Sequence, residues 1–270
     1  MRPIRRGLAS VLLVGALVGS SAVDAPLNEA RAQTPVPSGS VAPASSTAPA
    51  VGPASSYADL RLDQCLPQKA QPFLIRANWY PSSKDAEAIA KGKEWMAESL
   101  RYRTEQYGYF EGYGKKEWNA HPPIHYAVGT KFLGLPIRIN AKVVPALRCV
   151  ELALEKEGLL SKYKPQGYSG IRTKNTYRGA EISNHIFGIA IDIDPSLNTC
   201  CNCVKPWSEH RLCQNKKLTV YERMVMPKEW VPVFENYGFY WLGHDVIQDT
   251  MHFEFLGDPT KIIRHEGKSP

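Results

Sequence analysis

The sequence lacks a long hydrophobic run, an internal repeat and a stripe of basic residues alternating with aromatics. The apolar run near the N-terminus, Leu8 to Val18, is shorter than the roughly 20 residues that a membrane-spanning helix needs. The formal charge of the chain is +7, but its Lys and Arg residues are scattered. We therefore expect no nucleic-acid partner and no stable insertion into a membrane.

The first 32 residues have the three parts of a secretory signal peptide. Arg2, Arg5 and Arg6 precede the apolar run, and Ala30-Arg31-Ala32 provides an A-x-A cleavage signal. We expect residues 1–32 to be removed on export, with an uncleaved membrane anchor as the alternative. No cysteine lies near the cleavage site, which argues against a lipoprotein anchor.

A tether and one domain are expected to follow. Residues 33–56 consist almost entirely of Pro, Ala, Ser, Thr, Val and Gly, which is typical of a disordered linker. Residues 57–270 are long enough for one sizeable domain. Residues 1–32 hold four arginines and two acidic residues, so the remaining chain keeps a formal charge of +5. A mildly basic protein of this kind is compatible with an anionic cell wall, in the periplasm or outside the cell.

The cysteine content also suggests export. An even number of cysteines in an exported chain predicts up to three disulfides, with 15 possible pairings, from Cys65, Cys149, Cys200, Cys201, Cys203 and Cys213. Adjacent Cys200 and Cys201 are not expected to bond to each other, because such a bond strains the peptide. Bridges in this region would staple the loop after Asp194. The alternative is a zinc knot that includes His210, although paired C-x-x-C units are missing.

Helix patterns precede short strand patterns along the chain, which predicts the α+β class. Helices are expected over residues 83–107 with Ser83 as N-cap, over 144–158 after a cap at Asn140, and over 227–237. Strands are expected at 133–139, 239–241 and 252–255, with a strand or loop at 167–172 and an aromatic-rich loop over 107–125.

Residues 183–192 place a histidine and an aspartate seven positions apart. Ile189, Ile191 and Ile193 alternate with Ala190, Asp192 and Asp194, the pattern of a half-buried strand. An odd separation would put His185 and Asp192 on opposite faces of a continuous strand. We therefore expect the chain to turn near Gly188, so that the two side chains can converge.

A third polar group is expected from the last strand. If Met251, Phe253 and Phe255 face the core, His252 and Glu254 face the same side as the site. Two histidines and a carboxylate with water in the fourth position form a catalytic zinc arrangement, so we predict Zn²⁺ bound by His185, Asp192 and His252. Asp249 would be the general base.

The same residues also have simpler interpretations. Either histidine can be a structural residue, and Asp192 or Asp249 can serve a turn. Glu254 either orients a zinc-binding histidine or is solvated. His244 is a weaker candidate for a substrate contact.

At these residues the sequence resembles the VanY-type zinc D-alanyl-D-alanine carboxypeptidases and the related L-alanyl-D-glutamate peptidases of phage endolysins. The resemblance covers about residues 133–259. It rests on Ser183-x-His185-x-x-Gly188-x-Ala190-x-Asp192, Trp241-x-Gly243 and Asp249-x-x-His252-Phe253. Many family members have Glu where this chain has Asp249, while some endolysin-type relatives have Asp.

The resemblance implies a compact α+β domain with a central antiparallel sheet that carries the zinc site. It implies the roles given above for His185, Asp192, His252 and Asp249, and an arginine that holds a substrate carboxylate or polarises its carbonyl. Arg172 is the first candidate for that arginine, Arg178 is the reserve, and Ser183 is a further candidate for substrate binding.

The expected function is therefore an exported zinc metallopeptidase that hydrolyses peptidoglycan stem peptides, of the D,D-carboxypeptidase type. Three alternatives remain: a peptidoglycan endopeptidase of the L-alanyl-D-glutamate type, a non-catalytic zinc-containing binding domain, and an interaction module held together by disulfides.

Overall fold

The computed structural model describes residues 57–82, 84–176, 181–203, 205 and 207–264. All of them fall within the same compact unit. The expected signal peptide (1–32), the expected linker (33–56), Ser83 and Arg178 lie outside the described residues. Among the helices of the described part, none is long and apolar enough to cross a membrane.

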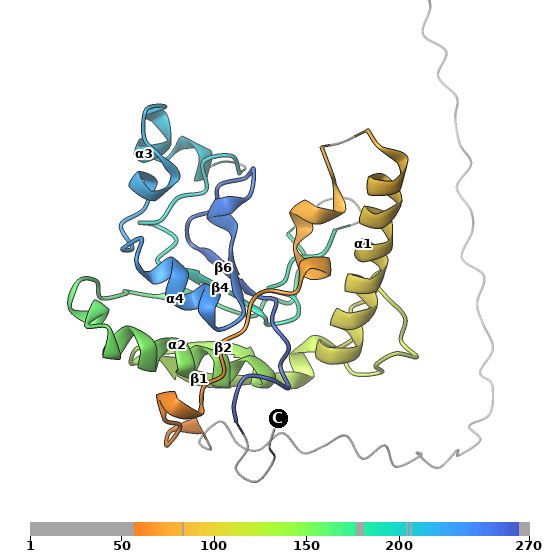
Figure 1. Cartoon of the computed structure of the whole chain (residues 1–270), viewed down its shortest axis with the longest axis horizontal. Coiled ribbons are helices and arrows are strands. Elements are labelled where there is room, and N and C mark those ends of the chain that lie inside the picture. The colour runs from red at the N-terminus through yellow and green to blue at the C-terminus, as the bar shows by residue number, and fades with distance from the viewer. Residues whose placement is uncertain (1–56, 83, 177–180, 204, 206, 265–270) are drawn as a thin grey trace, which may run out of the picture. The chain divides into compact units, whose positions relative to one another are not determined.

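A four-stranded antiparallel sheet carries the segments with the candidate site residues. Its strands are β3 (Tyr168–Ser169), β4 (Ala190–Ile193), β6 (His252–Phe255) and β5 (Phe239–Trp241), in that order across the sheet. The register places Asp192 opposite His252 on one side and opposite Ser169 on the other. Figure 1 shows this small sheet near the middle of the fold, with helices around it. The α+β prediction is confirmed.

A separate two-stranded hairpin joins β1 (Ala127–Phe132) to β2 (Leu135–Asn140). Leu133 and Gly134 form its turn with φ values of 47° and 82°, as a two-residue hairpin turn with positive φ at both positions requires. The predicted strand at 133–139 therefore begins two residues later. Its partner β1 was not predicted, because Gly129 and Lys131 interrupt the apolar alternation.

The described residues also form four α-helices: α1 (Ala86–Tyr107), α2 (Val144–Lys156), α3 (Arg211–Gln214) and α4 (Trp230–Asn236). Asp85 caps α1 by accepting a hydrogen bond from the Ala88 amide, so the prediction of Ser83 as N-cap is wrong. Asn140 caps a 3₁₀ turn that leads directly into α2. The predicted helix at 227–237 begins later, at Trp230, and α3 was not predicted.

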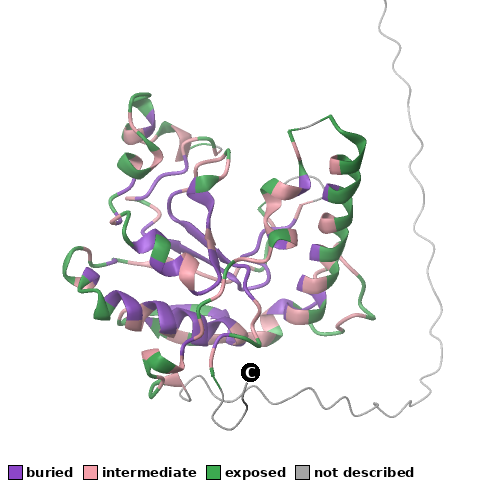
Figure 2. Ribbon diagram, viewed as in Figure 1, coloured by how far each residue is buried: buried purple, intermediate pink, exposed green. Residues whose placement is uncertain are grey.

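The helices α1, α2 and α4 pack against different parts of the fold. Helices α2 and α4 pack against each other, α4 also packs on β5, and α2 packs on β1. Helix α1 instead packs on two short 3₁₀ turns, Pro72–Leu74 and Arg76–Trp79. In Figure 2 the sheet is almost entirely buried, while α1 has a broad exposed face.

Strand β4 is buried on both faces, which corrects the prediction of a half-buried strand. Ile191 and Ile193 belong to the hydrophobic core, yet Asp192 and Asp194 are each only 3% exposed. Asp194 accepts hydrogen bonds from the amides of Gln166 (2.8 Å) and Gly167 (2.7 Å). Its carboxylate is therefore satisfied by the neighbouring backbone, and the polar face of β4 is covered by protein.

All six cysteines are paired, as Cys65–Cys149, Cys200–Cys203 and Cys201–Cys213. The prediction of three disulfides is confirmed, including the absence of a bond between the adjacent Cys200 and Cys201. Two of the bonds staple the loop after Asp194. The zinc-knot alternative does not hold, since paired cysteines have no thiolate to offer a metal.

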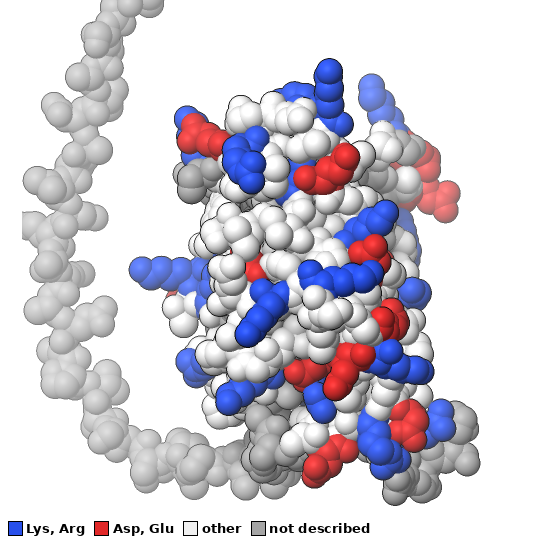
Figure 3. Space-filling model, turned by 90° about the vertical axis from the view of Figure 1, so that its left-hand side faces the viewer, with Lys and Arg blue, Asp and Glu red and all other residues white. Residues whose placement is uncertain are grey.

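Charged side chains of both signs are distributed over the surface. On the face shown in Figure 3, Lys and Arg lie among Asp and Glu and do not gather into one basic patch. This distribution matches the scattered positive charge of the sequence.

The turn before β4 depends on Gly188. Its φ is +67°, a left-handed conformation that costs other residues about 1–2 kcal/mol. Its amide donates to the carbonyl of His185 (3.1 Å), and its own carbonyl accepts from the Asn140 amide (2.8 Å). The predicted bend is confirmed at this residue. The hydrogen bond from Asn140 also fixes the bend to the start of the 3₁₀ turn that leads into α2.

Gly188→Ala is expected to destabilise the protein by more than the left-handed conformation alone explains. A Cβ at this position would lie 2.8 Å from the Asn140 nitrogen. The matched control is Gly158→Ala, since Gly158 has a φ of +68° and a Cβ added there would meet no atom within 4 Å. Urea unfolding should show a cost of about 1 kcal/mol for Gly158→Ala and a clearly larger cost for Gly188→Ala. Equal costs would contradict this account.

Candidate metal centre

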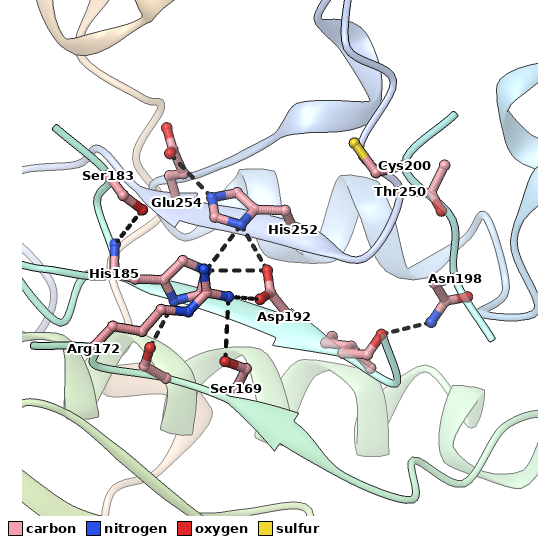
Figure 4. Close-up of polar contacts among 12 residues, drawn as sticks. Ser169, Arg172, Ser183, His185, Asp192, Asn198, Cys200, Thr250, His252 and Glu254 are labelled. Atoms are coloured by element: carbon pink, nitrogen blue, oxygen red, sulfur yellow. Dashed lines mark hydrogen bonds and ion pairs between the residues drawn. The ribbon is translucent and has the colours of Figure 1, made fainter. Parts of the chain in front are cut away.

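Three side chains from different elements converge beside the sheet. His185 comes from the turn before β4, Asp192 from β4 and His252 from β6. His185 Nε2 lies 3.1 Å from Asp192 Oδ1 and 3.2 Å from His252 Nδ1, and His252 Nδ1 lies 2.7 Å from the same Oδ1. Figure 4 shows the two rings and the carboxylate pointing toward one another. All three side chains are buried.

The outer nitrogen of each imidazole ring already has a partner. His185 Nδ1 lies 2.6 Å from the carbonyl oxygen of Gly170, which can only accept, so this nitrogen carries a hydrogen. His252 Nε2 donates to Glu254 Oε1 at 3.0 Å. In neutral rings the two inner nitrogens then carry lone pairs, and both face the carboxylate oxygen of Asp192. Three acceptors facing one another require a cation or a proton between them.

This donor set fits zinc. Two imidazole nitrogens and one carboxylate oxygen are the ligands of many catalytic zinc sites, which keep a fourth position open. Zinc–ligand bonds of about 2.0–2.2 Å separate tetrahedral ligand atoms by about 3.3–3.6 Å. His185 Nε2 lies near this spacing from the other two atoms, at 3.1 and 3.2 Å, whereas His252 Nδ1 and Asp192 Oδ1 are closer together, at 2.7 Å. Histidine ligands of zinc typically donate their other nitrogen to a carbonyl or a carboxylate, as both rings do.

Without a metal, a proton takes the cation's place. Burial alone would lower the pKa of His252, but its hydrogen bonds to Asp192 and Glu254 raise that pKa well above the ordinary value. Burial lowers the pKa of His185. For Asp192, burial is outweighed by the charges and hydrogen bonds of the two histidines, which hold its pKa well below the ordinary range. The metal-free site therefore carries its proton on His252.

The sequence left two interpretations for Glu254, a contact that orients a histidine or a solvated side chain. The structure shows the contact to His252. Glu254 is 1% exposed, and its Oε1 accepts the hydrogen of His252 Nε2.

Asp249 lies at the entry to β6 with one oxygen unsatisfied. Its Oδ1 is buried and has no hydrogen-bond partner. Burial raises the pKa of Asp249 to about 7; the positive charge of His252 opposes this, and the negative charges of Asp192 and Glu254 add to it. A carboxylate that titrates near neutral pH beside the cluster has the property that a general base needs.

The stapled loop holds Asp249 in place. Cys200 forms an antiparallel backbone bridge with Asp249, and the Thr250 amide donates to the Thr199 carbonyl at 2.7 Å. Cys200, Cys203 and Asp249 also form a compact group of ligand-type atoms, but the two sulfur atoms are bonded to each other.

Arg172 lies at the edge of the cluster. Its Nη2 donates to Asp192 Oδ2 (2.5 Å) and to the Ser169 hydroxyl (3.4 Å), while the other carboxylate oxygen, Oδ1, faces the two rings. The side chain is 34% exposed. Its Nε and Nη1 bond no other side chain of the described residues.

The other predicted substrate contacts lie elsewhere. The Ser183 hydroxyl accepts from the His185 amide (3.4 Å), and its residue is 2% exposed, so it shapes the turn. His244 bonds Glu235 (2.8 Å) on the surface and is not part of the cluster. Arg178 lies outside the described residues.

Several residues around the cluster were not predicted from the sequence. Gly170 offers its carbonyl, Asn184 and Arg76 contact Glu254, and Ser169 contacts Arg172. A flanking position could have suggested Asn184. No pattern in the sequence links Arg76 to a strand so far along the chain.

Comparison with known families agrees with this region of the chain. Residues 176–255 match a peptidase M15 family model described as D-alanyl-D-alanine carboxypeptidase. The match contains all three converging side chains and Asp249, and it confirms the resemblance to the VanY-type family. It indicates a metallopeptidase. Searches with the chain found no significant match among curated proteins or among solved structures.

Zinc binding is expected to release about one proton per ion at pH 8, because the metal displaces the proton of His252. Below pH 7 the release should rise further, since Asp249, with a pKa of about 7, is then also protonated and the metal charge expels that proton. Calorimetric titrations in two buffers of different ionisation enthalpy measure the released protons. Asp249→Asn should remove only the additional release at low pH. Binding without proton release at pH 8 would contradict the assignment of the proton to His252.

Proposed function

We propose that this protein is an exported zinc metallopeptidase that hydrolyses amide bonds in peptidoglycan stem peptides, with D,D-carboxypeptidase activity. One observation carries the proposal above the others. Two imidazole nitrogens and a carboxylate oxygen face one another at a point that requires a cation or a proton, next to a buried carboxylate oxygen with no partner. The family match over the same residues supports the substrate class.

His185, Asp192 and His252 would hold the zinc ion. When bound, zinc acts as a Lewis acid that polarises a carbonyl group and makes water nucleophilic near neutral pH. The protein's part is to present the three ligands in fixed orientations. The Gly170 carbonyl and Glu254 provide this by holding the outer nitrogen of each ring.

Asp249 would act as the general base and then as the acid. Its Oδ1 accepts a proton from the attacking water and delivers it to the leaving amine as the amide bond breaks. Because this oxygen has no hydrogen-bond partner among the described residues, it is available to take up the proton and to give it back.

Arg172 would bind the substrate. One guanidinium nitrogen is fixed on Asp192, which aims the group, and the remaining N–H groups can donate to a carbonyl oxygen or a terminal carboxylate. The same contact holds the Asp192 carboxylate through Oδ2, the oxygen that does not contact the rings. Ser183 and His244 remain candidates for substrate contacts.

Export is part of the proposal. Three disulfides involving all six cysteines support an oxidising compartment, the periplasm or the extracellular space. The composition of residues 1–56 supports a cleaved signal peptide followed by a linker.

Digestion of purified muropeptides tests the proposal. Mass spectrometry of the products should show loss of a terminal D-alanine, and a chelator should abolish this loss until zinc is restored. Cleavage between L-alanine and D-glutamate would identify an endopeptidase of the same class instead. Tight zinc binding with no cleavage of any muropeptide would indicate a binding domain.

Asp249→Asn is expected to lower kcat by about 10²–10⁴-fold while zinc still binds, because the amide cannot take up the proton. Asp249→Glu keeps the carboxylate and should retain much of the activity.

In the metal-free protein at pH 8, Asp249→Asn should raise the free energy of unfolding by on the order of 1–3 kcal/mol, since it removes a buried charge with an unpaired oxygen. The sign follows from the raised pKa: the ionised carboxylate destabilises the fold as pH rises through about 7.

Activity measurements and urea unfolding of the chelator-treated proteins give both quantities. An Asp249→Asn variant with unchanged kcat would refute the assignment of the base.

A further inference from the structure

A segment far outside the family match contributes a charged contact to the candidate metal centre. Arg76 lies in the 3₁₀ turn Arg76–Trp79, which packs against α1. Its Nη2 donates to Glu254 Oε1 at 3.1 Å, and the same oxygen accepts from His252 Nε2 at 3.0 Å. A continuous chain of charge and hydrogen bonds therefore runs from Arg76 through one carboxylate oxygen to a candidate zinc ligand.

The contact is buried, which makes the charge of Arg76 important. The Arg76 side chain is 11% exposed and that of Glu254 is 2% exposed. An unpaired carboxylate at such a depth costs several kcal/mol, and a positive partner offsets that cost.

Asn184 and Arg103 complete the surroundings of Glu254. Asn184 lies close enough to Glu254 to help lower its pKa, and the buried Arg103 donates to Asn184 Oδ1 at 2.9 Å, which fixes the direction of the amide. Arg103 belongs to α1, so the N-terminal part of the domain supplies both arginines. Arg76 also lies 3.8 Å from Glu181, which ties the turn to the segment before His185.

We propose that Arg76 is a positioning residue of the metal centre. By holding the Glu254 carboxylate in place, it keeps the hydrogen of His252 on Nε2 and leaves Nδ1 directed at the metal position. The contacts of Arg76 given above are to the carboxylates of Glu254 and Glu181. The inference rests on the proposed zinc site, and it does not depend on which peptide bond is cleaved.

Metal affinity and a spectroscopic signature test the inference without using activity. Arg76→Gln removes the charge while keeping a side chain that can donate a hydrogen bond. Its Zn²⁺ affinity, measured by competition with a chelating dye, should fall about 10- to 100-fold. The absorption bands of Co²⁺ bound in place of zinc should shift, because the ligand field of His252 changes. Arg76→Lys should regain most of the affinity.

The matched control is Arg61→Gln in the same N-terminal part of the domain. Arg61 pairs with Asp63 at 3.2 Å, and both side chains are exposed. Its replacement should leave Zn²⁺ affinity and the Co²⁺ spectrum at wild-type values. In hydrolysis assays Arg76→Gln should lower kcat with little change in KM, since Arg76 does not contact substrate.

A double substitution shows whether Arg76 acts through Glu254. In a Glu254→Gln background there is no carboxylate charge to hold, so adding Arg76→Gln should cause no further loss of Zn²⁺ affinity. This comparison also covers the case in which Arg76→Gln alone does not fold, because the double variant leaves no unpaired carboxylate at this position. A further tenfold loss in the double variant would overturn the proposal.

The outcomes separate this inference from the proposed function. A wild-type protein that binds neither Zn²⁺ nor Co²⁺ would refute the proposed function. A wild-type protein that binds both, with an Arg76→Gln variant of unchanged affinity and spectrum, would refute only the role of Arg76.

Discussion

The candidate metal centre depends on the position of one oxygen atom, Oδ1 of Asp192. This atom lies within hydrogen-bond distance of one nitrogen of each imidazole ring, His185 Nε2 and His252 Nδ1. Each ring donates its outer hydrogen to a fixed acceptor, so the inner nitrogens and Oδ1 all present lone pairs to one another. Such an arrangement is unfavourable unless a positive charge occupies its centre. A proton on His252 meets this need in one state, and a metal ion would meet it in the other.

The fold provides the rigidity that this arrangement requires. Antiparallel pairing of β4 with β6 places Asp192 directly opposite His252, so two of the three groups are fixed by backbone hydrogen bonds. The third group, His185, reaches the same point only because the chain reverses at Gly188, whose carbonyl is held by the Asn140 amide. The large apolar residues beneath, such as Phe253 and Ile191, are almost completely buried and leave the strands little freedom to shift.

Much of this arrangement could be predicted from the sequence, because it follows from local spacing. The alternation in 189–193 and 251–255 identified the strands, and the odd separation of His185 and Asp192 required the bend that the structure has at Gly188. Local spacing could not reveal contacts that depend on tertiary structure. The pairing of Arg76 with Glu254 joins distant segments, and the burial of Glu254 depends on that packing. Strand β1 was missed for a related reason, since its pairing with β2 stabilises a sequence of weak strand character.

The disulfide between Cys65 and Cys149 and the contact of Arg76 with Glu254 tie the N-terminal part of the domain to later parts of the chain. The domain therefore cannot be cut between these parts without losing contacts. The stretch that matches the peptidase family, 176–255, contains the three converging side chains and Asp249, yet several of the groups that hold them come from outside it. Gly170 precedes the stretch, as does Arg172, and Arg76 comes from the opposite end of the domain. The stretch that matches the family model therefore could not be separated from the rest of the domain without losing groups that hold the candidate metal centre. The family signature marks where the reaction would occur, while the ability to support it is distributed over the described domain.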